Sequence, residues 1–303
     1  MIKEITIVVL IILLIGLGYT LYVNISEIYA PAMRFMQNTT IDKDQPSYEN
    51  NIQFYPNMRF PDKSIGYNID LTCEENKIAR MIDAFNFIQN NTPLTFHQGN
   101  DIEVTCQEQN TDIDEKYFVA GEGGPTSSIN TSLFFAIQKG KVLLYYKERD
   151  RGCDINSYNI ELHELLHVFG FEHSSNKNSI MYNVSDCRQV VTLDIISELN
   201  RLYDILSLPD LYFAKSSAIK QGRYLNFSVE VKNRGLKKAE SVNFKAYDGA
   251  DNFYSYDLGE IDYGESKILW GLTKMQNANK LLFKIESGDE INKDNNAVEF
   301  YLL

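Results

Sequence analysis

The chain has 303 residues, of which 44% are hydrophobic and 12% aromatic, and this suits about two packed domains and excludes a disordered protein. The net charge of −12 is concentrated in the first 208 residues, which hold 16 basic against 27 acidic side chains, whereas the remainder holds 13 against 14. Phosphates need a basic face, so we expect neither nucleic acid nor anionic lipid as a partner.

Residues 5–23 form an uncharged apolar run that is long enough to cross a bilayer as a helix. The alternative is a cleaved signal peptide, but the small-x-small sequence Ala30-Pro31-Ala32 lies well beyond the run. We therefore predict an uncleaved transmembrane signal anchor over residues 1–25. Lys3 and Glu4 nearly cancel, so the flanking charge gives only a weak orientation signal.

Residues 26–60 are polar and contain three prolines, which is typical of a stalk between a membrane and a folded domain. Regular patterns begin after residue 60. In chain order they predict a strand at 65–69, a helix at 78–88, a strand at 101–105, and strands at 132–137 and 141–146 with a turn at 139–140. The glycines and proline of residues 122–125 predict a break before the last two strands.

A helix is predicted over residues 157–169, and it contains three chemically useful side chains. On a helix, positions i and i+4 project from the same face, so His163 and His167 can point at one ion, with Glu164 beside them. Leucines at positions 162, 165 and 166 form a second stripe on nearly the opposite face, which predicts a core side and a chemical side.

The end of this helix supplies a third histidine. Gly170 can adopt the left-handed backbone that ends a helix, which would return His173 toward the first two rings. Three neutral imidazoles and an open position for water are typical of a catalytic zinc site. The alternative is a helix end that happens to carry histidines. The fourth histidine, His97, is distant in sequence and is predicted to lie in a loop without a metal.

The second half of the chain changes character. Apolar spacing at positions 195, 196, 199, 202 and 203 predicts a closing helix of the first domain. After residue 209 apolar and polar residues alternate, with candidate strands at 225–231, 242–246, 280–285 and 298–303 separated by turn residues. We therefore predict an all-β sandwich over residues 209–303.

Four cysteines form an even set, which is compatible with two disulfides outside the cytoplasm. Sequence alone does not separate the three ways of pairing Cys73, Cys106, Cys153 and Cys187. We favour Cys73–Cys106 and Cys153–Cys187, because the second pair would brace the segments on either side of the histidine motif. The alternative is four unpaired buried thiols.

Residues 163–182 resemble the metzincin class of zinc endopeptidases, with the motif HExxHxxGxxH and a later methionine. Seven residues separate His173 from Met181, a spacing similar to that of the matrixin branch. Preceding segments, notably residues 83–85, 92–96 and 101–104, also resemble that branch. The resemblance covers about residues 61–205 and implies an α+β domain, a twisted mixed sheet with active-site and accessory helices, over residues 61–208.

The resemblance implies that His163, His167 and His173 hold one zinc ion and that Glu164 is the general base. The chemistry is independent of the family: zinc lowers the pKa of a water to about 7, and an adjacent carboxylate can take its proton and pass it to the leaving amine. Zinc is the cofactor that the sequence predicts; the motif neither requires nor excludes a calcium ion. By resemblance, an extended peptide would pair with an edge strand before the helix, among residues 128–146.

Met181 and Tyr182 would form the structural Met-turn beneath the ligands. Without the resemblance, Met181 would be interpreted as an ordinary core methionine. Tyr182 directly follows Met181, so a fifth, tyrosine ligand of the astacin kind is not expected. The stalk contains no cysteine, so a propeptide of the cysteine-switch kind is not expected either.

The C-terminal part resembles CARDB-type, immunoglobulin-like domains. The matching pieces are Pro209-Asp210-Leu211, residues 231–235 (VKNRG) and residues 289–296 (DEINKDNN). The resemblance implies an immunoglobulin-like sandwich that serves as a spacer or adhesive module, with a cell-surface or extracellular ligand as a candidate partner.

Together these features predict a zinc endopeptidase that hydrolyses peptide bonds of extracytoplasmic proteins. It would be held by a single pass in the cell membrane with both folded domains outside, and secretion after cleavage is the less favoured alternative. A competing hypothesis is a cell-surface adhesion protein with an inactive metzincin-like domain. An intact ligand set with Glu164 favours the enzyme, because an inactive remnant has no physical reason to keep the base. A small-substrate metalloamidase would need a closed pocket instead of a groove.

Overall fold

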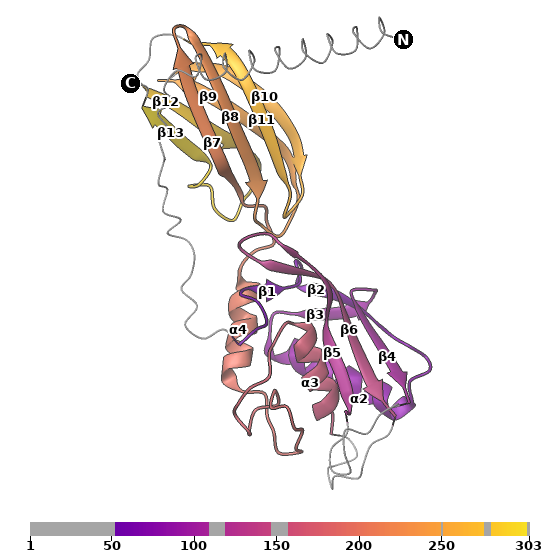
Figure 1. Cartoon of the computed structure of the whole chain (residues 1–303). Helices are drawn as coiled ribbons and strands as arrows, with labels where there is room; N and C mark the ends of the chain where they lie inside the picture. Colours follow the sequence, from indigo (N-terminus) through magenta and orange to yellow (C-terminus); the bar gives the residue numbers. More distant parts are fainter. Residues whose placement is uncertain (1–51, 109–118, 147–156, 250, 276–279, 302–303) are drawn as a thin grey trace, which may run out of the picture. The chain divides into compact units, whose positions relative to one another are not determined.

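The computed structural model describes residues 52–108, 119–146, 157–249, 251–275 and 280–301. They all belong to one compact unit, Ser47–Leu303. Its first part contains a six-stranded sheet and three helices, and its second part consists of seven strands in two sheets (Figure 1). A mixed α/β part is thus followed by a β-rich part, as the sequence predicts at this level.

The six-stranded sheet has the order β1-β6-β4-β2-β3, with β5 on the other side of β6. Its strands are β1 (Met58–Arg59), β2 (Ser64–Ile69), β3 (Thr95–Gln98), β4 (Ile102–Gln107), β5 (Gly121–Asn130) and β6 (Phe135–Tyr145). All neighbours pair in parallel except β5, which runs antiparallel to β6 from Gly121↔Leu144 to Asn130↔Phe135. Among the described strands, β5 therefore forms an edge of this sheet.

Helices α2 (Glu75–Asn91) and α3 (Asn159–Val168) contact each other, and α3 packs on β5 and β6 (Figure 1). The helix α2 extends beyond the predicted residues 78–88 at both ends and stops at Asn91, two residues before Pro93. A buried ion pair between Arg80 and Glu161, 3.1 Å apart, joins the two helices. The third helix, α4 (Leu193–Asp204), adds four buried side chains to the same core.

The glycines of β5 and β6 correct two predictions. Residues 122–125 are part of β5 instead of a break, and β6 runs straight through the predicted turn at residues 139–140. The physical reason is close packing: a Cβ on Gly140 would lie 2.4 Å from Cγ1 of Val168 on α3. Glycine here lets a helix approach the sheet, so its presence in the sequence does not mark a turn.

Residues 52–60, which the sequence analysis assigns to the stalk, pack with the elements that follow them. Gln53 donates to the carbonyl oxygens of Met58 and Phe169, at 2.6 and 2.9 Å. Arg59 is fully buried and donates to the Ile205 carbonyl oxygen (3.0 Å) beyond the end of α4. The packed part of the chain therefore begins before residue 61.

In the β-rich part, one sheet has the order β10-β9-β12-β13 and the other β11-β8-β7. The strands are β7 (Leu211–Gln221), β8 (Tyr224–Asn233), β9 (Ala239–Asp248), β10 (Asp251–Ile261), β11 (Ser266–Lys274), β12 (Lys280–Glu286) and β13 (Ala297–Tyr301). Alternate residues of both sheets form one core, centred on the rings of Phe227, Phe244 and Phe283, whose centroids lie 5.1–5.4 Å apart. The sequence predicts four of these strands, while β7, β10 and β11 come only from the structure.

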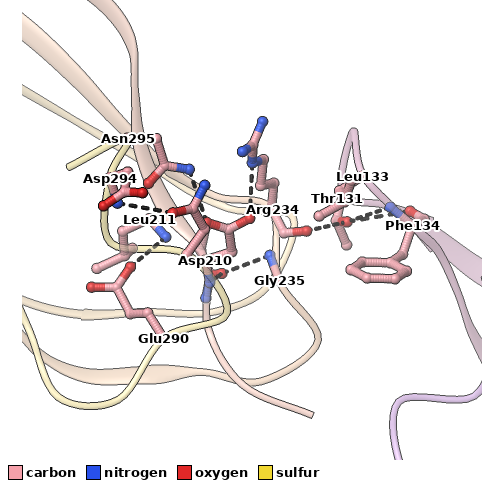
Figure 2. Close-up of polar contacts among 12 residues, drawn as sticks. Thr131, Leu133, Phe134, Asp210, Leu211, Arg234, Gly235, Glu290, Asp294 and Asn295 are labelled. Atoms are coloured by element: carbon pink, nitrogen blue, oxygen red, sulfur yellow. Dashed lines mark hydrogen bonds and ion pairs between the residues drawn. The ribbon is translucent and has the colours of Figure 1, made fainter. Parts of the chain in front are cut away.

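Segments that carry the CARDB resemblance converge on a buried polar network (Figure 2). Both carboxylate oxygens of Asp210 accept hydrogen bonds, from Nε of Arg234 (2.9 Å) and Nδ2 of Asn295 (3.0 Å). Glu290 accepts from the backbone N–H of Leu211 (2.8 Å), and Asn233 accepts from that of Asp210 (3.1 Å). The network therefore ties the start of this region to two distant loops.

The turn between β5 and β6 contacts the same network. The hydroxyl of Thr131 is buried and donates to the carbonyl oxygen of Arg234 at 2.7 Å (Figure 2). Close by, Phe134 and Leu236 belong to a small separate apolar cluster. The far end of β5 is therefore held by residues of the β-rich region.

Cys73 and Cys106 form a disulfide, as the favoured pairing predicts. Cys187 is disulfide-bonded too, and its predicted partner Cys153 lies outside the described residues. None of the helices in the described ranges has the length and hydropathy needed to span a bilayer. The predicted anchor over residues 1–25 lies outside those ranges.

Candidate metal centre

The helix α3 places His163, Glu164 and His167 inside the domain. It is buried on all sides from Glu161 to Val168, so the two stripes predicted from the sequence do not separate a core side from an open side there. The two histidines and the glutamate are each only 7–8% exposed. Burying polar groups is costly unless they find partners, so each of them requires a specific partner.

Gly170 ends the helix in the left-handed conformation that the sequence predicts, with φ of +85°. Its N–H bonds to the carbonyl oxygen of His167 (2.9 Å), and that of Phe171 bonds back to the Leu166 carbonyl oxygen (3.2 Å). This backbone reversal satisfies carbonyl groups at the helix end and turns the chain back. It is the step that brings His173 to the site.

The three predicted ligands meet at their Nε2 atoms. These atoms are 3.1 Å apart in His163 and His167, 3.2 Å in His167 and His173, and 3.3 Å in His163 and His173. Within the described residues they form the one group of three or more potential metal ligands that could share an ion. His173 is exposed, so the triangle opens to solvent on its side.

Backbone carbonyls fix the protonation of two rings. The Nδ1 atom of His163 lies 2.6 Å from the carbonyl oxygen of Ile180, and that of His167 lies 2.7 Å from that of Phe171. A carbonyl oxygen can only accept, so both Nδ1 atoms carry the proton and, in the neutral rings, both Nε2 atoms carry a lone pair. Two lone pairs that face each other at 3.1 Å repel unless a cation lies between them.

The triangle fits a zinc ion. With zinc–nitrogen distances of about 2.0–2.1 Å, the ligand atoms of a tetrahedral site lie about 3.3 Å apart, close to the observed spacing. Burial lowers the pKa of His163 and of His167 to about 4, so both rings are neutral at pH 7. Neutral imidazole is the form that binds a metal.

Glu164 lies beside the triangle. Burial, together with the nearby carboxylates of Glu122 and Glu161, raises the pKa of its carboxyl group to about 8. A cation held by the three rings would act in the opposite direction, because a nearby positive charge favours the ionised form. The protonation state of Glu164 therefore depends on whether an ion is bound. A carboxyl group whose pKa can be shifted in this way is typical of a general base.

The turn at residues 179–182, after His173, contacts the ring of His163. The N–H of Tyr182 bonds to the carbonyl oxygen of Ser179 (3.0 Å), which closes a β-turn whose second residue supplies the carbonyl for His163. Met181 is buried in the main core, at 1% exposure. The predicted Met-turn residues therefore lie in a tight turn bonded directly to the first ligand.

Sequence analysis missed several groups around the site. Phe54, from the predicted stalk, stacks on the ring of His167 with centroids 5.8 Å apart. Gly121 and Gly123 of β5 lie directly against Glu164. Their alternation at every second position was the available signal, since glycines on one face of a strand mark a close backbone approach. His97, by contrast, lies in β3 instead of the predicted loop, where it is exposed, bonds to Ser64 (3.1 Å) and is not part of the triangle.

Comparison with known families agrees with the sequence-based prediction for this part of the chain. Residues 60–204 match the model of the matrixin family. Residues 60–204 form a matrixin domain. The three histidines, Glu164 and the turn at residues 179–182 lie inside this domain, which together with the histidine geometry supports a zinc metalloprotease in general. No curated protein sequence matches the chain.

Solved structures resemble both parts of the chain. The hatching-enzyme zinc protease high choriolytic enzyme 1 of the medaka fish Oryzias latipes is 14% identical, with a TM-score of 0.33, over 51% of this chain and 99% of its own. The CARDB domain of a Pyrococcus furiosus protein, solved in complex with di-metal ions, is 17% identical, with a TM-score of 0.28, over 31% of this chain and 87% of its own.

Proposed function

We propose that the chain is a zinc-dependent endopeptidase in which Glu164 activates the attacking water. The observation that supports this best is the Nε2 triangle of 3.1–3.3 Å, in which at least two nitrogens present lone pairs to a common point. A single N–H from His173 cannot fully satisfy both lone pairs, whereas a divalent cation can. His163, His167 and His173 would hold that ion.

The residues divide the work between binding and proton transfer. Zinc, when bound, supplies a Lewis acid that lowers the pKa of a water and polarises the scissile carbonyl. The carboxylate of Glu164 would take a proton from the attacking water and deliver it to the nitrogen of the leaving amine. The carbonyl oxygens of Ile180 and Phe171 keep the two buried rings in the required tautomer and orientation.

We propose β5 as the edge along which a peptide substrate lies. Among the described strands it pairs only with β6, so one side of its backbone is free to accept an extended peptide. Its first residues lie against Glu164, which would bring the scissile bond near the base. Pairing through the backbone recognises any extended segment, and this suits an endopeptidase of folded or unfolded proteins.

Location and the role of the C-terminal region are further proposals. We propose that residues 1–25 anchor the chain in the cell membrane and that residues from 61 onward lie outside the cytoplasm. The disulfide Cys73–Cys106 supports this, because disulfides persist outside the cytoplasm. For residues 209–303 we propose an immunoglobulin-like accessory sandwich that can bind an extracellular ligand.

Replacing the base by its amide tests the proposed function. Glu164→Gln should bind zinc as tightly as the wild type and lose about 10²- to 10⁴-fold in the rate of peptide hydrolysis, because the amide cannot take a proton. A peptide-library digest and metal analysis of the full chain would measure both. Glu172→Gln, an exposed carboxylate at the end of the motif, should change the rate by at most about twofold. Equal activity of wild type and Glu164→Gln would overturn the mechanism.

A further inference from the structure

Two glycines of β5 contact the same residue of α3. A Cβ built on Gly123 would lie 2.1 Å from the carbonyl oxygen of Glu164 and 2.8 Å from its Cα. A Cβ built on Gly121 would lie 2.8 Å from Cγ of Glu164 and 3.2 Å from its Cδ. At Gly124, the next residue along the strand, nothing lies within 4 Å. A Cβ on Gly121 would also lie 3.1 Å from the carbonyl oxygen of Leu143, but its shortest contact is with Glu164. The absence of side chains at positions 121 and 123 therefore leaves room mainly for Glu164.

We propose that Gly121 and Gly123 are positioning residues that fix the carboxylate of Glu164 relative to the edge of β5. Gly123 allows the backbone of β5 to touch the backbone of α3 at Glu164. Gly121 bounds the space that the side chain of Glu164 occupies. The inference depends on the proposed function, because it assigns the proposed base and the proposed substrate edge a fixed spacing.

The physical consequence is a coupling between substrate register and proton transfer. A peptide that pairs with β5 takes its position from the backbone of that strand, and the base takes its position from the same strand. A displacement of about 1 Å between reacting groups can lower the rate about 100-fold. Direct contact between β5 and Glu164 would therefore help to keep the rate of proton transfer high. Burial of Glu164 at 7% exposure leaves little room for the side chain to move elsewhere.

Ordinary close packing is the alternative, and Gly140 provides the comparison. This glycine also lies against α3, but its neighbour is the side chain of Val168 at 2.4 Å and not the base. A Gly140→Ala variant disturbs the contact of helix and sheet without touching Glu164. Gly124→Ala adds the same methyl group to β5 in open space. Comparison with these two variants shows whether the effect of Gly121→Ala comes from its contact with Glu164 or from general packing of the helix on the sheet.

The kinetic test uses the full-length, zinc-loaded protein and a peptide substrate. Gly121→Ala should lower kcat by about 10- to 100-fold, because the added methyl group displaces the carboxylate of Glu164. KM and zinc affinity should stay within about twofold of wild type, because the atoms nearest this methyl group belong to Glu164 and Leu143 and not to the three histidines. Gly124→Ala should lower kcat far less than Gly121→Ala. A kcat for Gly121→Ala within about twofold of wild type, or a loss of activity that follows a loss of zinc, would overturn the proposal.

An activity-independent test uses a double-mutant cycle on thermal unfolding. Gly121→Ala should lower the unfolding temperature of the wild type by more than that of Glu164→Ala, which lacks the Cγ that the new methyl group meets. The contact of that methyl group with the carbonyl oxygen of Leu143 is the same in both backgrounds. Gly140→Ala should lower the unfolding temperature equally in both backgrounds. Equal effects of Gly121→Ala in both backgrounds would overturn the positioning role. A wild type without peptidase activity would contradict the proposed function, and this cycle would still decide the role of Gly121.

Discussion

Two buried polar clusters in this protein differ in how their polar atoms are satisfied. In the network around Asp210, both carboxylate oxygens accept hydrogen bonds from side chains of the protein, Arg234 and Asn295. In the cluster around His163 and His167, each Nδ1 has a protein partner, but the Nε2 atoms point at one another. The carboxylate of Asp210 is thus satisfied by the protein itself, whereas the three imidazoles have the donor set of a metal site.

The difference separates a structural network from a ligand site on chemical grounds alone. A carboxylate is an acceptor and a guanidinium is a donor, so they satisfy each other directly. Imidazoles whose protons are already engaged at Nδ1 can offer only lone pairs at Nε2, and lone pairs need a cation. Burial and proximity are common to both clusters and do not distinguish them.

The largest expected effect is in the histidine cluster. His167→Ala should weaken zinc binding by more than about 100-fold, because even the loss of an outer partner of a ligand costs 10- to 100-fold. Added zinc should then no longer raise the unfolding temperature. Isothermal titration calorimetry with zinc measures the first effect and a thermal scan the second. His97→Ala, which removes an exposed histidine, is the control, and a similar loss in both variants would contradict the comparison.

Arg234→Met tests how much the buried carboxylate of Asp210 depends on its protein partner. It leaves Asp210 buried without its cationic partner, and breaking such a pair costs about 3–5 kcal/mol of unfolding free energy. Urea denaturation measures this loss, and the zinc affinity of the folded protein should not change. The control is Lys215→Met, which breaks the exposed pair Lys215–Glu230 and should have little effect. A stable Arg234→Met variant would show that the network is not essential.

The pH dependence of the zinc-free protein should separate the histidines from Glu164. The pKa of His163 and of His167 is about 4 in the folded protein, below the usual 6.5, so their contribution to stability is lost as the pH falls from about 6.5 toward 4. The pKa of Glu164 is about 8, above the usual 4.5, so its contribution is present below pH 4.5 and is lost as the pH rises through 8.

Unfolding of the chelated protein at several pH values measures both effects. Relative to Glu164→Gln, the wild type should lose stability steadily between pH 4.5 and 8. A difference between the two proteins that does not change with pH would contradict the assignment of the raised pKa to Glu164.

The smallest effect concerns the turn that joins the two regions. Thr131→Val removes the hydroxyl that donates to the carbonyl oxygen of Arg234 and accepts from the N–H of Phe134. Losing these buried bonds should cost about 1–3 kcal/mol of unfolding free energy. Chemical denaturation measures it, with Ser128→Ala, at an exposed position of β5, as the control. An unchanged stability would show that this contact does not help to hold the turn of β5 and β6.

Local patterns predicted the parts of this protein that depend on nearby residues. The spacing of His163 and His167 predicted that they share a face, and Gly170 predicted the end of the helix and the return of His173. The strands of the β-rich region followed from alternation at residues 225–231 and 242–246. The same local reasoning failed in β5 and β6, where glycines were interpreted as turns, because it cannot represent a helix that presses on the strand.

By itself, the sequence determined which three histidines converge and which carboxylate lies beside them, because spacing along one helix and one glycine fixes where those side chains project. Only the tertiary structure decided what surrounds them: the carbonyl of Ile180 behind His163, Phe54 against His167, and Gly121 against Glu164. Such contacts join residues far apart in the chain, and their geometry depends on how closely two backbones approach. That distance is set by packing and has no local signature in the sequence.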